Sequence, residues 1–154
     1  MDLRNNEPCP VCGRYRNRRI AVDAIILKGE SILLIKRRGN PFRGMWALPG
    51  GGIEFDETAE EALKKEVEEE VGLSIKTARF LRVYTDPRRD PNQVITLSYL
   101  VIAEGKPEAG SDAASYQFFP LDALPEAMAF DHRQIIQDYL DGDIGETDLS
   151  ELEM

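Results

Sequence analysis

The chain has 154 residues, 42% hydrophobic and 31% charged, which is typical of one globular domain with a sizeable core. No apolar segment approaches the about 20 residues that span a bilayer. The N-terminus lacks an apolar secretory signal, so we expect a cytoplasmic protein with no membrane partner. The net charge of −9 divides into +6 for residues 1–50 and −15 for residues 51–154. This acidic body argues against a nucleic-acid partner, because phosphate contacts need cations, whereas a basic edge beside an acidic site suits a small phosphorylated ligand.

Residues 1–19 form a predicted leader that contains a Cys-x-x-Cys pair, Cys9 and Cys12, and several arginines. A closed zinc site needs four Cys or His ligands, and the chain has two cysteines and one histidine. Three interpretations stay open: a zinc ion shared across a dimer, a vestigial knuckle, or two free thiols. We favour the last two over Zn²⁺, since a single Cys-x-x-Cys pair is a weak signal.

The next segment is predicted to be a hairpin followed by a glycine-rich turn. Residues 21–27 and 31–36 have the composition of two strands joined by a short turn. Residues 37–44 form a loop rich in chain breakers, and residues 45–49 form a short extended piece. It leads into three glycines at 50–52, where the backbone can take φ > 0 and approach a ligand closely.

A helix is predicted to begin near residues 56–58 and to end before Gly72. Thr58 and Glu61 have the spacing of a capping box, and Gly72 suits the position just past a helix. The apolar stripe of this helix comprises Ala59, Ala62, Leu63 and Val67.

The remaining chain predicts more strands than helices. Residues 73–76, 79–84, 94–103 and 117–120 read as extended. A second helix should have Asp131 as its N-cap and should point Ile135, Ile136, Tyr139 and Leu140 inward. Residues 141–154 read as an acidic C-terminal tail. The coarse result is one mixed α/β domain over residues 20–140.

Three carboxylates gather on one face of the first helix. At about 100° per residue, Glu66, Glu69 and Glu70 fall within about a quarter-turn, while Glu68 points away. Carboxylate oxygens at this spacing suit Mg²⁺, which also binds substrate phosphates. A solvated acidic face is the alternative, since like-charged pairs cost only about 0.2–0.5 kcal/mol each. The adjoining glycines favour a metal site over a solvated acidic face.

Residues 51–73 resemble the Nudix box, G-x5-E-x7-R-E-U-x-E-E-x-G-U, where U is a bulky aliphatic residue. Every fixed position matches except one, where Lys65 replaces arginine. The lead-in at residues 46–51 is also similar, and the resemblance covers about residues 20–140. It implies an α/β/α sandwich with a mixed β-sheet. It also implies hydrolysis of a nucleoside diphosphate linked to another group, with Mg²⁺ or Mn²⁺ as cofactor.

The resemblance also implies roles for the residues of the box. The metal ligands would be the Gly51 carbonyl, Glu66, Glu69 and Glu70. Glu69 is the candidate general base, and Glu57 would orient the ligands or add to the metal shell. Lys65 keeps the charge of the usual arginine but loses its planar fork, so we expect weaker orientation of Glu57 or Glu66.

A second departure from the family concerns the base. In relatives similar to ADP-ribose pyrophosphatases, a glutamate precedes the second short strand, and Ser115 stands at that position here. A serine is no general base unaided, so Asp112 or a glutamate of the box would have to take that role.

Residues 84–91 resemble the substrate loop of ADP-ribose pyrophosphatases, with Pro87 near the marker proline of that subgroup. The candidate substrate-binding residues are Arg37, Trp46, Tyr84, Arg88 and Arg89. Arginines would grip phosphate or ribose, and the aromatic rings, together with Phe42, would stack on a base. A plain surface loop with core aromatics is the alternative. His132 is predicted to be a surface residue rather than a catalyst.

The leading hypothesis is a Mg²⁺-dependent pyrophosphatase that acts on ADP-ribose or a similar nucleotide sugar. The alternatives are a nucleoside triphosphate pyrophosphohydrolase, a nucleotide-sensing module without turnover, and a zinc-dependent nucleic-acid binder built on the leader. Many members of the resembled family are dimers, so a homodimer is retained as a partner hypothesis.

Overall fold

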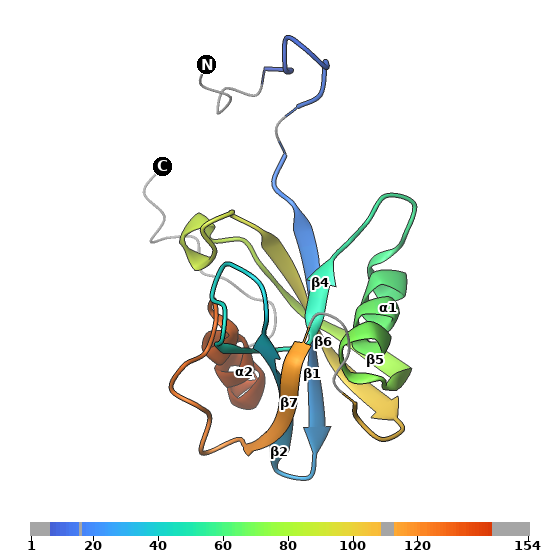
Figure 1. Ribbon diagram of the computed structural model, residues 1–154, viewed down its shortest axis with the longest axis vertical. Coiled ribbons are helices and arrows are strands. Elements are labelled where there is room, and N and C mark those ends of the chain that lie inside the picture. The colour runs from blue at the N-terminus through green and yellow to red at the C-terminus, as the bar shows by residue number, and fades with distance from the viewer. Residues whose placement is uncertain (1–6, 16, 109–112, 143–154) are drawn as a thin grey trace.

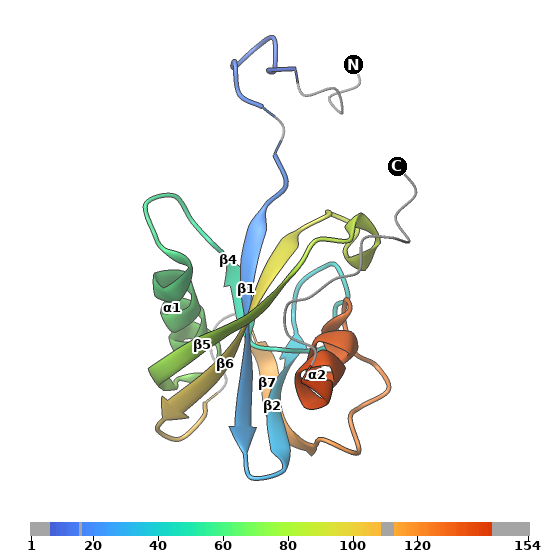
Figure 2. The same cartoon turned by 180° about the vertical axis from the view of Figure 1, so that it is seen from behind.

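The computed structural model describes residues 7–15, 17–108 and 113–142. Within them, a seven-stranded sheet is flanked by two α-helices (Figures 1 and 2). The strands are β1 Ile20–Lys28, β2 Ser31–Arg37, β3 Trp46–Ala47, β4 Gly50–Gly52, β5 Ser74–Tyr84, β6 Ile95–Glu104 and β7 Ala113–Pro120. The helices are α1 Ala59–Val71 and α2 His132–Asp141, and a 3₁₀ turn spans Pro87–Arg89.

The sheet is mixed. Its main path runs β3-β2-β1-β6-β5, while β4 pairs with β1 and β7 with β2. Strands β1 and β6 are parallel, and β1 and β2 form the predicted antiparallel hairpin. The parallel pairing brings residues that are about 75 positions apart in sequence side by side, and one end of the candidate site depends on it.

Both faces of the central strands are buried, which explains their continuous apolar runs. Successive side chains point to opposite faces of a strand, so Val22 and Ala24 of β1 enter the core beneath α1 while Ile25 enters the core beneath α2. In β2, Leu33 and Ile32 divide in the same way. The predicted α/β/α sandwich with a mixed sheet is confirmed.

Helix α1 has the predicted ends. The Thr58 hydroxyl accepts the backbone N–H of Glu61 at 3.1 Å, and Gly72 closes the helix in the left-handed region at φ 69°. Leu63 and Val67 of its apolar stripe are fully buried. Because α1 is capped at both ends, the glutamates along it have fixed positions relative to the sheet.

The prediction that Leu140 of α2 points inward is wrong, since 43% of this residue is exposed. His132 and Asp138 are buried along with Ile135, so the buried face is centred near Ile135 and Tyr139. At about 100° per residue, Leu140 lies more than a quarter-turn from that centre. Because the polar residues His132 and Asp138 also face the sheet, α2 is rotated about its axis relative to the orientation that would bury only its apolar residues.

Two strand predictions were too short. Residues 74–76 and 79–84 belong to the single strand β5, whose pairing with β6 shifts register twice, and residue 73 lies just before this strand. The strand predicted at 117–120 begins at residue 113 as β7. Asp131 is at the N-cap of α2, as predicted, but its side chain makes no capping hydrogen bond because it pairs with Arg89 instead.

No helix among the described residues is long and apolar enough to cross a membrane. Most of the predicted tail at 141–154 and the alternative base Asp112 lie outside the described residues. The boundaries drawn at residues 19 and 141 stay predictions.

Candidate active site

The glycine strand β4 packs tightly between β1 and α1. A Cβ atom at Gly51 would lie 2.5 Å from the Glu66 side chain, and one at Gly50 would lie 2.1 Å from the Val22 carbonyl oxygen. Only glycine therefore fits at these two positions, where the β4 backbone lies directly against the Glu66 side chain and the β1 backbone. The Gly50 N–H donates to Glu70 Oε1 at 3.3 Å, which links the strand to the last turn of α1.

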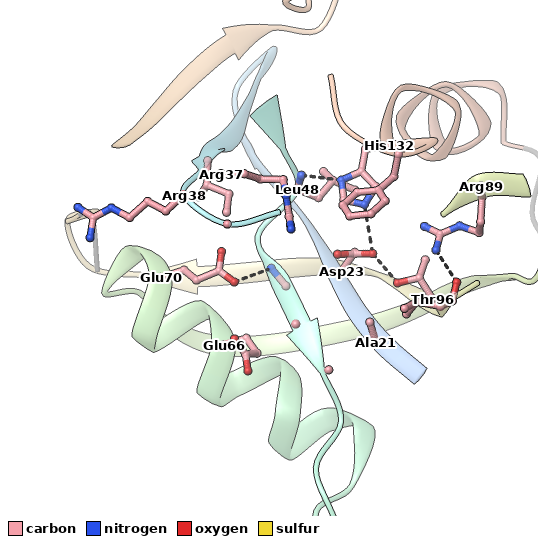
Figure 3. Close-up of a pocket in the computed structure, with 17 residues that line it drawn as sticks. Ala21, Asp23, Arg37, Arg38, Leu48, Glu66, Glu70, Arg89, Thr96 and His132 are labelled. Atoms are coloured by element: carbon pink, nitrogen blue, oxygen red, sulfur yellow. Dashed lines mark hydrogen bonds and ion pairs between the residues drawn. The ribbon is translucent and has the colours of Figure 1, made fainter. Parts of the chain in front are cut away.

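This contact forms one end of a cavity of about 490 Å³ (Figure 3). Glu66 and Glu70 reach into it from α1 on one side, and a group of polar side chains from the sheet and α2 lies on the other. The lining residues are Ala21, Asp23, Ile35, Arg37, Arg38, Gly39, Leu48, Gly50, Gly51, Gly52, Glu66, Glu70, Arg89, Val94, Thr96, Phe130 and His132. A cavity with carboxylates at one end and arginines near its rim has room for a small charged ligand.

The predicted box residues are not all in the cavity. Glu66 and Glu70 line it, whereas Glu69, which directly precedes Glu70 in α1, is exposed to solvent. Glu68 is exposed as well. Among the described residues, no three Asp, Glu, His or Cys side chains are gathered as a ready metal site. The carboxylate end thus consists of two inward glutamates, a glycine backbone and one glutamate at the solvent side.

Lys65 joins the two halves of the box. Its ammonium donates to both oxygens of Glu57, at 3.0 and 3.1 Å, and lies 4.0 Å from Glu66. The Glu54 N–H also donates to Glu57 at 2.7 Å; this bond, more than the lysine, lowers the pKa of Glu57. The Glu57 hydrogen bond in turn raises the pKa of Lys65. Lysine therefore performs the bridging role expected of arginine, through one nitrogen instead of a fork.

Two of the predicted substrate arginines, Arg37 and Arg89, line the cavity. The Arg37 guanidinium lies 4.9 Å from the centre of the Phe130 ring. Arg89 is almost fully buried, donates to both oxygens of Asp131 at 2.8 and 3.0 Å, and reaches the Val94 carbonyl at 2.7 Å. Arg37 can meet a ligand, while Arg89 fixes the cavity wall.

The other candidates lie elsewhere. Tyr84 and Arg88 line a second, more open hollow of about 670 Å³ on the side of α2, and Arg89 borders both hollows. Arg88 pairs with exposed Asp86, and burial together with a hydrogen bond to Asp138 raises the pKa of Tyr84. Trp46 packs edge-on against Phe119 and lines neither hollow. The structure therefore does not bring Trp46, Tyr84 and Arg88 to the carboxylate cavity. Phe42 packs against Phe130, 4.7 Å between ring centres.

The model of the NUDIX domain family matches residues 17–139 of this chain. The chain belongs to the Nudix family. An ADP-ribose pyrophosphatase of Methanocaldococcus jannaschii is 48% identical over 128 residues, which cover 82% of this chain and 75% of the relative. The family expected from the box is therefore confirmed, and with it the class of enzyme, a pyrophosphatase hydrolase.

Two solved structures support the same assignment. A MutT NUDIX hydrolase from Burkholderia pseudomallei is 30% identical with a TM-score of 0.71, over 79% of this chain and 98% of that one. A bifunctional NMN adenylyltransferase/ADP ribose pyrophosphatase from Francisella tularensis, complexed with AMP and manganese, is 26% identical with a TM-score of 0.72. The match covers 83% of this chain and 42% of that longer chain.

Nudix hydrolases generally use divalent cations, and the carboxylate end of the cavity fits one. Hard cations take carboxylate and carbonyl oxygens. Glu66 and Glu70 supply carboxylates beside β4, where a Cβ at Gly51 would occupy the space next to Glu66. The donor set and the space thus suit Mg²⁺ or Mn²⁺.

The opposite end of the cavity contains three residues of the Nudix chain that the sequence did not assign to the site: Asp23, Thr96 and His132. The prediction that His132 is a surface residue is wrong, since 3% of it is exposed. The Leu48 N–H donates to His132 Nδ1 at 3.0 Å, so in the neutral ring the proton is on Nε2, which lies 3.5 Å from Asp23 Oδ2. The Thr96 hydroxyl donates to the same Asp23 oxygen.

Burial acts to raise the pKa of Asp23, but it is outweighed by the hydrogen bonds of His132 and Thr96 and the charge of Arg89, so this pKa lies below its usual range. A carboxylate in the middle of the apolar run Ala21-Val22-Asp23-Ala24-Ile25 is the signal that the sequence offers. A charge is almost never placed inside a strand that is covered on both faces unless it is paired.

Proposed function

We propose that this Nudix hydrolase cleaves the diphosphate bond of ADP-ribose or a similar nucleotide sugar by attack of water, with Mg²⁺ or Mn²⁺ as cofactor. The observation that carries the proposal is one cavity that joins the carboxylates of Glu66 and Glu70 to the arginines Arg37 and Arg38. The 48% identity to an ADP-ribose pyrophosphatase supports this substrate class over others.

The residues at the carboxylate end have distinct tasks. Glu66, Glu69, Glu70 and the Gly51 carbonyl would hold the cation, which supplies charge neutralisation at the diphosphate and a lowered pKa of its bound water. Glu69 faces solvent at the edge of this group and is the base we propose for the attacking water. Glu57, held by Lys65 and the Glu54 N–H, keeps the turn before α1 in position.

The basic rim would bind the substrate. Arg37 lies over the Phe130 ring, and both residues line the cavity that contains Glu66 and Glu70. A guanidinium can donate two parallel hydrogen bonds to phosphate oxygens. Ser115 lies opposite Lys36 in the pairing of β7 with β2, so the strand itself brings no carboxylate to that position. This supports a base from the box.

A substrate panel tests the proposal. The full chain is incubated with ADP-ribose, dinucleotides, other nucleotide sugars and nucleoside triphosphates, each with Mg²⁺ or Mn²⁺, and the products are separated by chromatography. Release of AMP and ribose 5-phosphate from ADP-ribose at the highest kcat/KM supports the proposal. Pyrophosphate release from a triphosphate as the preferred reaction would support the triphosphate pyrophosphohydrolase instead.

Turnover must also depend on the carboxylate end of the cavity. The variant Glu66→Gln/Glu70→Gln keeps similar side-chain volume and should lose activity while the circular dichroism spectrum stays unchanged. Tight binding of ADP-ribose by the wild type with no turnover in either metal would identify a sensing module and contradict the proposal.

A further inference from the structure

The N-terminal segment that contains both cysteines forms a compact turn of its own. The Cys9 carbonyl accepts the Gly13 N–H at 2.8 Å, and the Cys9 N–H donates to the Arg14 carbonyl at 2.7 Å. Gly13 takes φ 73°, a conformation that glycine adopts at little cost. The backbone thus returns on itself around the Cys-x-x-Cys pair instead of running past it.

The turn directs backbone donors at one sulfur. The N–H groups of Cys12 and Val11 and the Cys12 thiol are directed at the Cys9 sulfur as hydrogen-bond donors. Both cysteines are free thiols, with Cys12 exposed and Cys9 partly exposed. Donors aimed at sulfur stabilise a thiolate, which is the form that binds metals.

We propose that Cys9 and Cys12 form half of a zinc site that a second copy of this chain completes with its own two cysteines. Structural zinc takes four thiolate or imidazole ligands in a tetrahedron. The whole sequence offers two cysteines and one histidine, and His132 is buried between Leu48 and Asp23. One chain therefore supplies only two ligands at this place, and an identical turn supplies the same two.

The position of the turn makes such a contact accessible. Figures 1 and 2 show the segment extending away from the sheet and both helices, so the body of the domain does not screen it. Four thiolates around Zn²⁺ leave two negative charges, and the exposed arginine Arg14 follows the turn directly. Cationic neighbours stabilise thiolates, so this residue offsets the excess charge.

The base of the segment is fixed to the domain near the second hollow. Arg18 donates to the carbonyl oxygens of Gln93 and Thr85, at 2.6 and 2.8 Å. These residues flank the 3₁₀ turn that contains Arg88 and Arg89. A zinc-linked pair would consequently hold two domains together through segments anchored beside their β5–β6 loops.

Metal content and mass test the proposal on the full chain, purified under reducing conditions without a histidine tag. Elemental analysis should find about one zinc per two chains, and light scattering should give a dimer that becomes a monomer with a chelator. Substituted Co²⁺ should show the absorption of a tetrahedral thiolate site. The variants Cys9→Ser and Cys12→Ser should each lose the metal and the doubled mass.

The Glu66→Gln/Glu70→Gln variant is the matched control, because it removes the carboxylates that could bind stray zinc and should leave the zinc content and the doubled mass unchanged. The zinc site does not depend on the proposed catalysis, and the two fail separately. Zinc at one ion per chain in a monomer, a disulfide between Cys9 and Cys12 in place of the metal, or no cysteine-dependent metal at all would overturn the proposal.

Discussion

The two ends of the cavity are built in different ways. The carboxylate end comes from one short segment, in which β4 and α1 place Glu66, Glu70 and the glycines side by side. The inner end takes Asp23 from β1, Thr96 from β6 and His132 from α2. The first end is set by helical spacing within about twenty residues, and the second exists only when the whole sheet is assembled.

The two ends of the cavity therefore have different expected roles, turnover at the carboxylate end and stability at the inner end. Residues at the carboxylate end face the cavity or solvent with oxygens that suit a cation, whereas those at the inner end bind mainly to one another. Removing a group from the first end should reduce turnover with little loss of stability. Removing one from the second should reduce stability first.

The largest expected effect is at the carboxylate end. Glu69→Gln should lower kcat by about 10²–10⁴-fold, because the proposed base loses its ability to accept a proton. Steady-state kinetics with ADP-ribose measures the change, and thermal unfolding should be unaffected. Glu68→Gln, on the neighbouring exposed position, should be nearly silent. A Glu69→Gln enzyme with near-normal turnover would show that the base lies elsewhere.

At the inner end, Arg89→Ala should destabilise the protein by about 3–5 kcal/mol. The substitution leaves Asp131 without the bidentate partner that its carboxylate has at 2.8 and 3.0 Å. Denaturant unfolding measures the free energy of unfolding. Arg88→Ala is the adjacent control and should have no measurable effect, since its pair with Asp86 is exposed. Equal losses in the two variants would rule out a special role for the buried pair.

The contrast between the two ends also explains what could be predicted. The strands at 21–36 and helix α1 with its Thr58 and Gly72 ends follow from local patterns, and the structure agrees with these elements. Of the carboxylates predicted from the box, Glu66 and Glu70 line the cavity, whereas Glu69 is exposed. The positions of Asp23 and His132 do not follow from such patterns. Their partners are 73 and 84 residues away in sequence, at Thr96 and Leu48, and depend on the parallel pairing of β1 with β6 and on the docking of α2.

The same limit applies to the substrate loop. Tyr84 and Arg88 belong to the segment that resembles the substrate loop of ADP-ribose pyrophosphatases, and their side chains are of types that bind nucleotides. The sheet instead directs Tyr84 toward Asp138 of α2, on the opposite side from α1. The type of a residue indicates which ligands its side chain can bind, but the register of β5 determines on which face of the sheet that side chain lies.

A smaller effect is expected for His132→Phe, which keeps an aromatic ring but removes the acceptor of the Leu48 N–H. A buried donor left without a partner costs about 1–3 kcal/mol, so unfolding should occur at lower denaturant concentration. Hydrogen exchange at the Leu48 amide gives a local readout and should be faster in the variant. Unchanged protection of that amide would contradict the link between α2 and the segment before β4.

Acid should weaken the inner end through Asp23. Because the pKa of Asp23 is lowered in the folded state, its stabilisation is fully present above the usual pKa of an aspartate and is lost as the pH falls through the folded value. Asp23→Asn removes this titration, so the variant should be less stable at neutral pH and its stability should fall less on acidification than that of the wild type. Unfolding curves from neutral pH down to about pH 3 measure both. Parallel pH profiles for the two proteins would show that the carboxylate of Asp23 is not the acid-sensitive group.

The smallest expected effect tests the local frame of the carboxylate end. Thr58→Ala removes the side chain that caps α1 and should cost about 1 kcal/mol of stability, since the Glu61 N–H loses its acceptor. Thr58→Ser keeps the hydroxyl and should restore most of that loss. Because the glutamates that we propose as metal ligands lie two to three turns further along the helix, kcat should stay within a few-fold of wild type. A large loss of kcat with a small loss of stability would mean that the helix start orients the glutamates directly, and the two ends of the cavity would then differ less than their construction indicates.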